Sequence, residues 1–258
     1  MPIHSHVIHA QLETRECTAE LYINGFPITK LKPNEHAISI SVNEFLVSGK
    51  NHLEVRVDMV ADIKQPHNPW ARARIAKLSD GASVKAVAPN DILSEITLRG
   101  FETLKETKTS TTWFDFNIIY EPWAWQNAPI LHLNDALIDK AHTVLQEAAA
   151  VLFSGDLERY WLFFEVKLLD ALRAYPAASE IFVRTHLKQL LAQNKGRETL
   201  APFLDRKRHA FRVVAMGHAL HCIDSDGLPS LRMRNAQGIV IPCRMFLAYV
   251  GSDLKVVR

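Results

Sequence analysis

The stretch VLFSGDLERYW, residues 151–161, ends one apolar helical pattern and begins another. Upstream of it, apolar residues over 137–152 recur at spacings of three and four, as on one face of an α-helix. Ser154-Gly155 is typical of a helix end, because glycine readily takes a left-handed conformation there. Asp156 can cap the following helix through its side-chain oxygen. The stretch therefore predicts two helices joined by a tight break.

Downstream of the break, the pattern stays helical and then becomes strand-like. We expect the first helix to begin at Asn134 or Asp135, the second to end at Tyr175-Pro176 and a third to cover 177–193. Short apolar runs then alternate with turn signals rich in Gly, Asn and Asp, which predict an antiparallel meander. These runs are Phe211–Ile223, Ser230–Arg234, Ile239–Val250 and Leu254–Arg258. Helices followed by such strands predict an α+β layout.

Residues 1–120 have the two-residue period of half-buried strands. Turn signals such as Asn24-Gly25 and Ser48-Gly49 separate the runs. Seven strands are expected, at His6–Ala10, Ala19–Ile23, Ala37–Val42, His52–Val57, Ala71–Leu78, Ser94–Leu98 and Trp113–Tyr120. Many short strands without helical windows favour a β-sandwich.

A segment with two prolines and no periodicity, 120–129, separates these two patterns. We therefore predict two domains, an all-β sandwich over 1–122 and an α+β domain over 134–258, with a linker over 123–133.

Composition narrows the function classes. The chain has 258 residues, a formal net charge of +2 and no run near about eighteen apolar residues, so neither a nucleic-acid partner nor a membrane span is expected. Its start lacks the pattern of a secretory signal, which points to the cytoplasm. Cys17, Cys222 and Cys243 have no disulfide or metal-ligand spacing and suit a reducing compartment as packing residues.

Two longer stretches resemble known families. ALIDKAHTVLQEAAAVLFSGDLERYW (136–161) and GLPSLRMRNAQGIVIPCRMFLAYVGSDLKVVR (227–258) are similar to the nuclear transport factor 2-like, or SnoaL-like, superfamily. This resemblance implies a cone in which helices pack on a curved antiparallel sheet. AELYINGFPI (19–28) and ISISVNEFLVSGKNHLEVRV (38–57) resemble jelly-roll, galactose-binding-like sandwiches. No catalytic motif of the first superfamily aligns here, and its members include enzymes, binders and association modules.

His218, in GHALHCIDSDG, is the candidate general base, with Tyr160 as hydrogen-bond donor. Strand alternation places His218 and Asp224 on one face and His221 on the other, so a metal site is not expected. The alternative is that these are ordinary strand and turn residues.

The candidate ligand-binding residues are Trp161 and Phe164, as the wall of a pocket, and Arg232 and Arg244, as holders of an anion. Plain core packing of the aromatics and solvated arginines are the alternatives. Exposed tryptophans among Trp70, Trp113, Trp123 and Trp125 would suit a sugar, whereas buried ones would be core.

We therefore expect a non-enzymatic binding or interaction protein without cofactor or metal, which forms a homodimer and takes a protein partner or a small apolar ligand. One alternative is a small-molecule isomerase, hydratase or cyclase that works in the cone of the second domain. Another is carbohydrate binding by the first domain.

Overall fold

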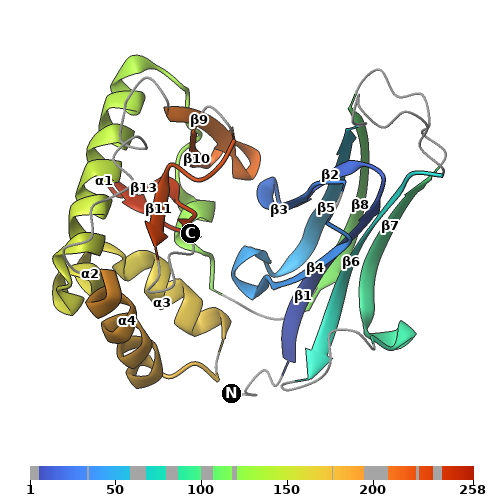
Figure 1. Ribbon diagram of the computed structural model, residues 1–258, viewed down its shortest axis with the longest axis horizontal. Coiled ribbons are helices and arrows are strands. Elements are labelled where there is room, and N and C mark those ends of the chain that lie inside the picture. The colour runs from blue at the N-terminus through green and yellow to red at the C-terminus, as the bar shows by residue number, and fades with distance from the viewer. Residues whose placement is uncertain are drawn as a thin grey trace. The chain divides into compact units, whose positions relative to one another are not determined.

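The computed structural model describes residues 6–33, 35–58, 68–79, 87–99, 107–117, 121–175, 177–194, 209–224, 227–234 and 240–258. Within these ranges the fold is β-rich, with fourteen strands in four antiparallel sheets and four α-helices (Figure 1). The chain divides into two compact units, Met1–Glu121 and Pro122–Arg258. No described helix is both long and apolar enough to cross a membrane.

The first unit contains two four-stranded antiparallel sheets (Figure 1). One has the strand order β4-β1-β6-β7 and the other β3-β2-β5-β8. The strands are β1 (His6–Arg15), β2 (Thr18–Ile23), β3 (Phe26–Leu31), β4 (Ala37–Ser41), β5 (Gly49–Asp58), β6 (Trp70–Ser79), β7 (Ile92–Arg99) and β8 (Lys108–Phe116). All seven predicted strands overlap these, and β3 is the additional one.

Alternation along the strands puts one face of each sheet in the core. The fully buried residues at every second position include Ile8, Ala10 and Leu12 on β1 and Leu53, Val55 and Val57 on β5. Near the start of β5, buried Asn51 donates to the carbonyls of Val47 and Gly49, at 2.8 and 2.9 Å, and accepts from the Val47 amide at 2.8 Å. Asn51 thus orders the backbone at the predicted turn signal Ser48-Gly49.

The second unit contains the helices α1 (Asp135–Ser154), α2 (Leu157–Phe163), α3 (Glu165–Ala174) and α4 (Glu180–Asn194). Its larger sheet has the order β14-β13-β10-β9, from β9 (His209–Val214), β10 (Ala219–Asp224), β13 (Phe246–Val250) and β14 (Asp253–Val256). β11 (Leu231–Arg234) pairs with β12 (Val240–Cys243). Helix residues such as Leu145 and Leu152 share one core with strand residues such as Leu220 and Leu247.

The predicted break at residues 154–156 is confirmed. Asn134 caps α1 by accepting a hydrogen bond from the Leu137 amide at 2.9 Å. Gly155 ends α1 in the left-handed conformation, with φ at 71°. Asp156 accepts from the Arg159 amide at 3.1 Å and starts α2.

The second predicted helix is wrong in one respect, because Phe164 divides it into α2 and α3. Phe164 has a backbone that is not helical, with φ at −97° and ψ at 13°. Hydrogen bonds still run from the Phe164 amide to the Tyr160 carbonyl and from the Leu168 amide to the Phe164 carbonyl, at 3.0 and 2.9 Å. The apolar spacing therefore continues unchanged across the break.

Two further predictions are wrong, because each run predicted as a single strand contains two strands in the structure. Phe211–Ile223 folds back on itself through a turn at Ala215–Gly217, where Ala215 and Met216 have φ at 53° and 54°. Ile239–Val250 contains β12 and β13, which belong to different sheets. Apolar residues flank both turns, and Gly217 in the first run and Arg244 in the second are single interruptions that a strand can also contain.

The segment 123–133, predicted as a linker, lies within the second unit. Its short 3-10 helix, η3 (Ala124–Asn127), follows Trp123, which is fully buried. Trp125 and Leu131 are buried as well. The segment lacks periodicity and contains Pro129, but it is nevertheless packed into the second unit.

Candidate binding groove

A groove of about 470 Å³ lies in the second unit between α1, α2, α3 and the strand β14. Its apolar lining residues come from all four elements. They are Val144, Val151, Leu162, Phe163, Val166, Leu254 and Val256. Apolar helix side chains thus face the strand across a space that can take other side chains.

Charged residues also line the groove, and all of them are exposed. They are Glu147, Arg159, Glu165, Asp253 and Lys255. Because water reaches these groups, they form a solvated rim around the apolar lining.

Leu162 is the most exposed of the apolar lining residues, with 74% of its surface accessible. Leu162 is not among the candidate residues predicted from the sequence. A signal was present, since residues 160–164 are five consecutive apolar residues, more than one face of a helix can bury. Such a run places at least one large side chain outside the core.

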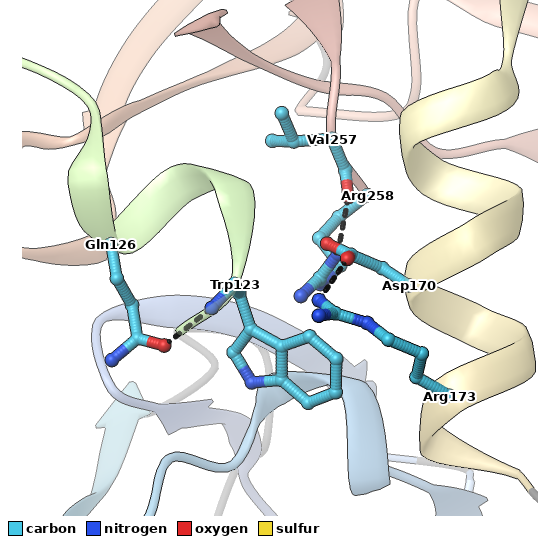
Figure 2. A network of polar contacts seen from close by, with 6 residues as sticks. All are labelled: Trp123, Gln126, Asp170, Arg173, Val257 and Arg258. Atoms are coloured by element: carbon cyan, nitrogen blue, oxygen red, sulfur yellow. Dashed lines mark hydrogen bonds and ion pairs between the residues drawn. The ribbon is translucent and has the colours of Figure 1, made fainter. Parts of the chain in front are cut away.

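The second unit contains a buried ion pair between Asp170 and Arg258 (Figure 2). The Arg258 Nη1 donates to a carboxylate oxygen of Asp170 at 2.6 Å, and these side chains are only 2% and 6% exposed. The other oxygen of Asp170 accepts from Arg173 on the same helix. The guanidinium carbons of Arg173 and Arg258 lie 4.8 and 4.9 Å from the ring centroid of Trp123.

This cluster connects η3, α3 and the residues after β14. The Gln126 side chain accepts from the Trp123 amide at 2.8 Å, which orders the start of η3 (Figure 2). Asp170 and Arg258 are separated by 88 residues in the chain. The cluster therefore has a structural role. Trp123 can be completely buried beside two cations because the face of its ring attracts positive charge and Asp170 pairs with both arginines.

The predicted pocket aromatics lie together in the core of the second unit. Tyr160, Trp161 and Phe164 are all buried in the same apolar cluster. The rings of Tyr160 and Phe164 are 4.5 Å apart, and burial raises the pKa of Tyr160 well above its ordinary value. Arg184 lies 4.0 Å above the Trp161 ring. Core packing accounts for these three residues.

His218 lies at a different place, beside the segment that precedes α1. Its Nδ1 donates a hydrogen bond to the carbonyl oxygen of Ala128 at 2.6 Å. His218 does not line the groove between the helices and β14. His221, on β10, stacks against Phe246 with ring centroids 4.5 Å apart.

The two arginines predicted to hold an anion have different surroundings. Arg232 pairs with buried Asp224, and its Nε donates to the Pro229 carbonyl at 3.1 Å. Asp224 also accepts a hydrogen bond from the Leu228 amide at 3.0 Å, as is typical of an aspartate beside a turn. Arg244 is exposed, between β12 and β13. The charge of Arg232 is thus balanced within the protein.

Trp113 is the exposed tryptophan of the first unit, with 60% of its surface accessible. It lies on β8 opposite His52 on β5, and the two rings are 4.8 Å apart. Trp70 is half-buried. Trp113 and His52 therefore present an aromatic surface on the outer face of their sheet.

In the part of the chain that the structure describes, no three His, Cys, Asp or Glu side chains gather as metal ligands. No known family, curated protein or solved structure matches this chain.

Proposed function

We propose that this is a non-enzymatic protein-interaction protein and that the groove beside β14 is its interaction surface. The observation that carries the proposal is the exposed Leu162 above a groove with an apolar lining and a solvated charged rim. Apolar contact supplies affinity in such surfaces, and rim charges supply specificity.

At the level of fold, we propose a jelly-roll sandwich for the first unit and a nuclear transport factor 2-like cone for the second. Two four-stranded antiparallel sheets in the first unit support the sandwich. Helices that share one core with a four-stranded antiparallel sheet support the cone. Both folds commonly present binding surfaces, which is compatible with an interaction role.

The same observations speak against an isomerase, hydratase or cyclase that uses His218 and Tyr160. A base and a donor must reach one cavity to act on one substrate. Tyr160 packs in the core against Phe164, whereas His218 bonds to the Ala128 carbonyl. Turnover of any member of a broad metabolite panel by the purified protein would contradict the proposed function.

The proposal is tested by selecting peptides from a phage-displayed random library on the purified protein and measuring their affinities by calorimetry. Leu162→Asp should weaken binding about tenfold or more, because it places a charge in the apolar groove. Leu169→Asp is the matched control, since Leu169 is 46% exposed on α3 but does not line the groove. Failure to select a peptide, or equal effects of both substitutions, would refute the proposal.

A second candidate function, carbohydrate binding by the first unit, is favoured by the exposed pair of Trp113 and His52. Sugar rings stack on exposed aromatic faces. A glycan array gives the test: Trp113→Ala should abolish any signal, while Thr109→Ala, on the same strand, should leave it unchanged. Binding that survives Trp113→Ala would exclude this site.

A further inference from the structure

The strand β14 is at one end of the strand order of its sheet, with β13 as its neighbour. Asp253 pairs with Val250 and Lys255 with Ala248 across the β13–β14 hairpin. Beyond β14, the Val257 amide donates to the Phe246 carbonyl at 2.8 Å, so odd-numbered residues direct their backbone groups toward β13. The N–H and C=O groups of Leu254 and Val256 consequently point to the opposite, outer edge.

The groove runs along this outer edge. Side chains of successive strand residues point to opposite faces of a sheet, so a pocket over one face would be lined by alternate residues. All four residues of β14, 253–256, line the groove. The groove therefore lies beside the strand, where an added strand would pair with it.

The sequence of β14 is complementary to itself in the antiparallel direction. With Leu254 opposite Leu254 of a second copy, Asp253 of each copy stands opposite Lys255 of the other. Opposite charges that face each other across strands stabilise a sheet. Leu254 is a position whose backbone groups point outward, so this register also supplies two hydrogen bonds between the copies.

We propose that a second copy of this chain occupies the groove by pairing its β14 with β14 of the first copy, antiparallel about Leu254. This pairing rests on the proposed function, since it names the partner of the same surface. It joins two four-stranded sheets into one and covers Leu162 in both copies, because Leu162 lines the edge that becomes occupied.

Lys255 then has a second role. A lysine on an edge strand normally discourages pairing with other strands. In a register shifted so that Lys255 stands opposite itself, two ammonium groups face each other and the pairing is disfavoured. The same residue that deters other registers is therefore satisfied by Asp253 in the register about Leu254.

Charge reversal tests this pairing. Asp253→Lys places lysines opposite each other twice, and Lys255→Asp places aspartates opposite each other twice. Each variant should raise the dimer dissociation constant about tenfold or more in analytical ultracentrifugation. Both positions are exposed, so folding should be retained. An equimolar mixture of the two variants should form a heterodimer with wild-type affinity, because every opposed pair is then of opposite charge.

Amide hydrogen exchange, followed by NMR at low and high protein concentration, tests the backbone pairing without a substitution. The Leu254 amide should become more protected as the dimer forms. The Asp253 and Lys255 amides face β13 at both concentrations and serve as controls, so their protection should not change. Equal exchange of the Leu254 amide at both concentrations would refute strand pairing.

The strand pairing is also refuted if the wild-type protein is monomeric at about 100 µM, a concentration at which a dimer of micromolar affinity would form. It is equally refuted if the equimolar mixture of the two charge-reversal variants remains monomeric. In either case, peptide binding that Leu162→Asp abolishes would leave the proposed function standing with a different partner. Loss of both dimerisation and groove-dependent peptide binding would refute the two proposals together.

Discussion

Replacing Asp170 by Asn should destabilise the second unit strongly. The substitution keeps the size of the side chain but leaves the Arg258 guanidinium, only 2% exposed, without its 2.6 Å carboxylate partner. Removing one member of a buried ion pair costs about 3–5 kcal/mol, because the remaining charge is desolvated and uncompensated. The hydrogen bond from Arg258 to the Val257 carbonyl and its contact with Trp123 remain, so we expect the lower end, about 3 kcal/mol.

Urea and thermal unfolding followed by circular dichroism at the helical band measure this change, since the described α-helices all belong to the second unit. The midpoint temperature should fall by about 10 °C. Arg173→Gln is the control: Arg173 also pairs with Asp170 but is 39% exposed, so its loss should cost no more than about 1 kcal/mol.

A double variant, Asp170→Leu with Arg258→Met, separates the charge effect from the packing effect. It removes both buried charges, so it should be more stable than Asp170→Asn. A cost of Asp170→Asn below about 1 kcal/mol, or a double variant less stable than the single one, would refute the assignment of a buried, stabilising pair.

Three further outcomes are expected. Gly155→Ala and Asp156→Ala should each lower the unfolding free energy of the second unit by about 1 kcal/mol. Gly155→Ala forces an alanine to adopt φ 71°, and Asp156→Ala removes the N-cap of α2. Unchanged urea midpoints would contradict this expectation. Burial lowers the pKa of His9, so its contribution to stability is full above its ordinary pKa of 6.5 and is lost as the pH falls through the lower folded value. His9→Gln should therefore reduce the decrease in unfolding free energy at low pH, as urea titrations across this pH range would measure. Burial raises the pKa of Cys17 to about 11 and also raises that of Cys222, so both thiols should resist Ellman's reagent at about pH 8 until the protein unfolds.

The local features of the fold could be predicted from sequence because their causes are local. Gly155 and Asp156 end and restart helices through their own backbone and side-chain geometry, and Asn51 orders a turn only a few residues long. The break at Phe164 could not be predicted, since it preserves both the apolar spacing and the hydrogen bonds across it. In the turn at Ala215–Gly217, Ala215 and Met216 also take the left-handed conformation, which residues of these types rarely adopt, so the single glycine did not indicate the full turn.

The candidate site was less accessible to sequence reasoning, because it depends on contacts between distant segments. The groove brings α1 beside β14, about one hundred residues later in the chain. Aromatic residues and histidines were predicted as site residues because of their chemistry, but Tyr160 and Trp161 pack in the hydrophobic core. The accessible residues of the groove, such as Leu162 and Lys255, belong to types that are common on any surface.

The tryptophans differ between the two units in a way that provides optical reporters. Trp113 is open to solvent in the first unit, whereas Trp123 and Trp125 are enclosed in the second. Iodide should therefore quench a long-wavelength component from Trp113 in the native protein and leave the short-wavelength emission of the enclosed indoles unaffected. A ligand that binds either unit could then be assigned to that unit from the wavelength at which the fluorescence changes.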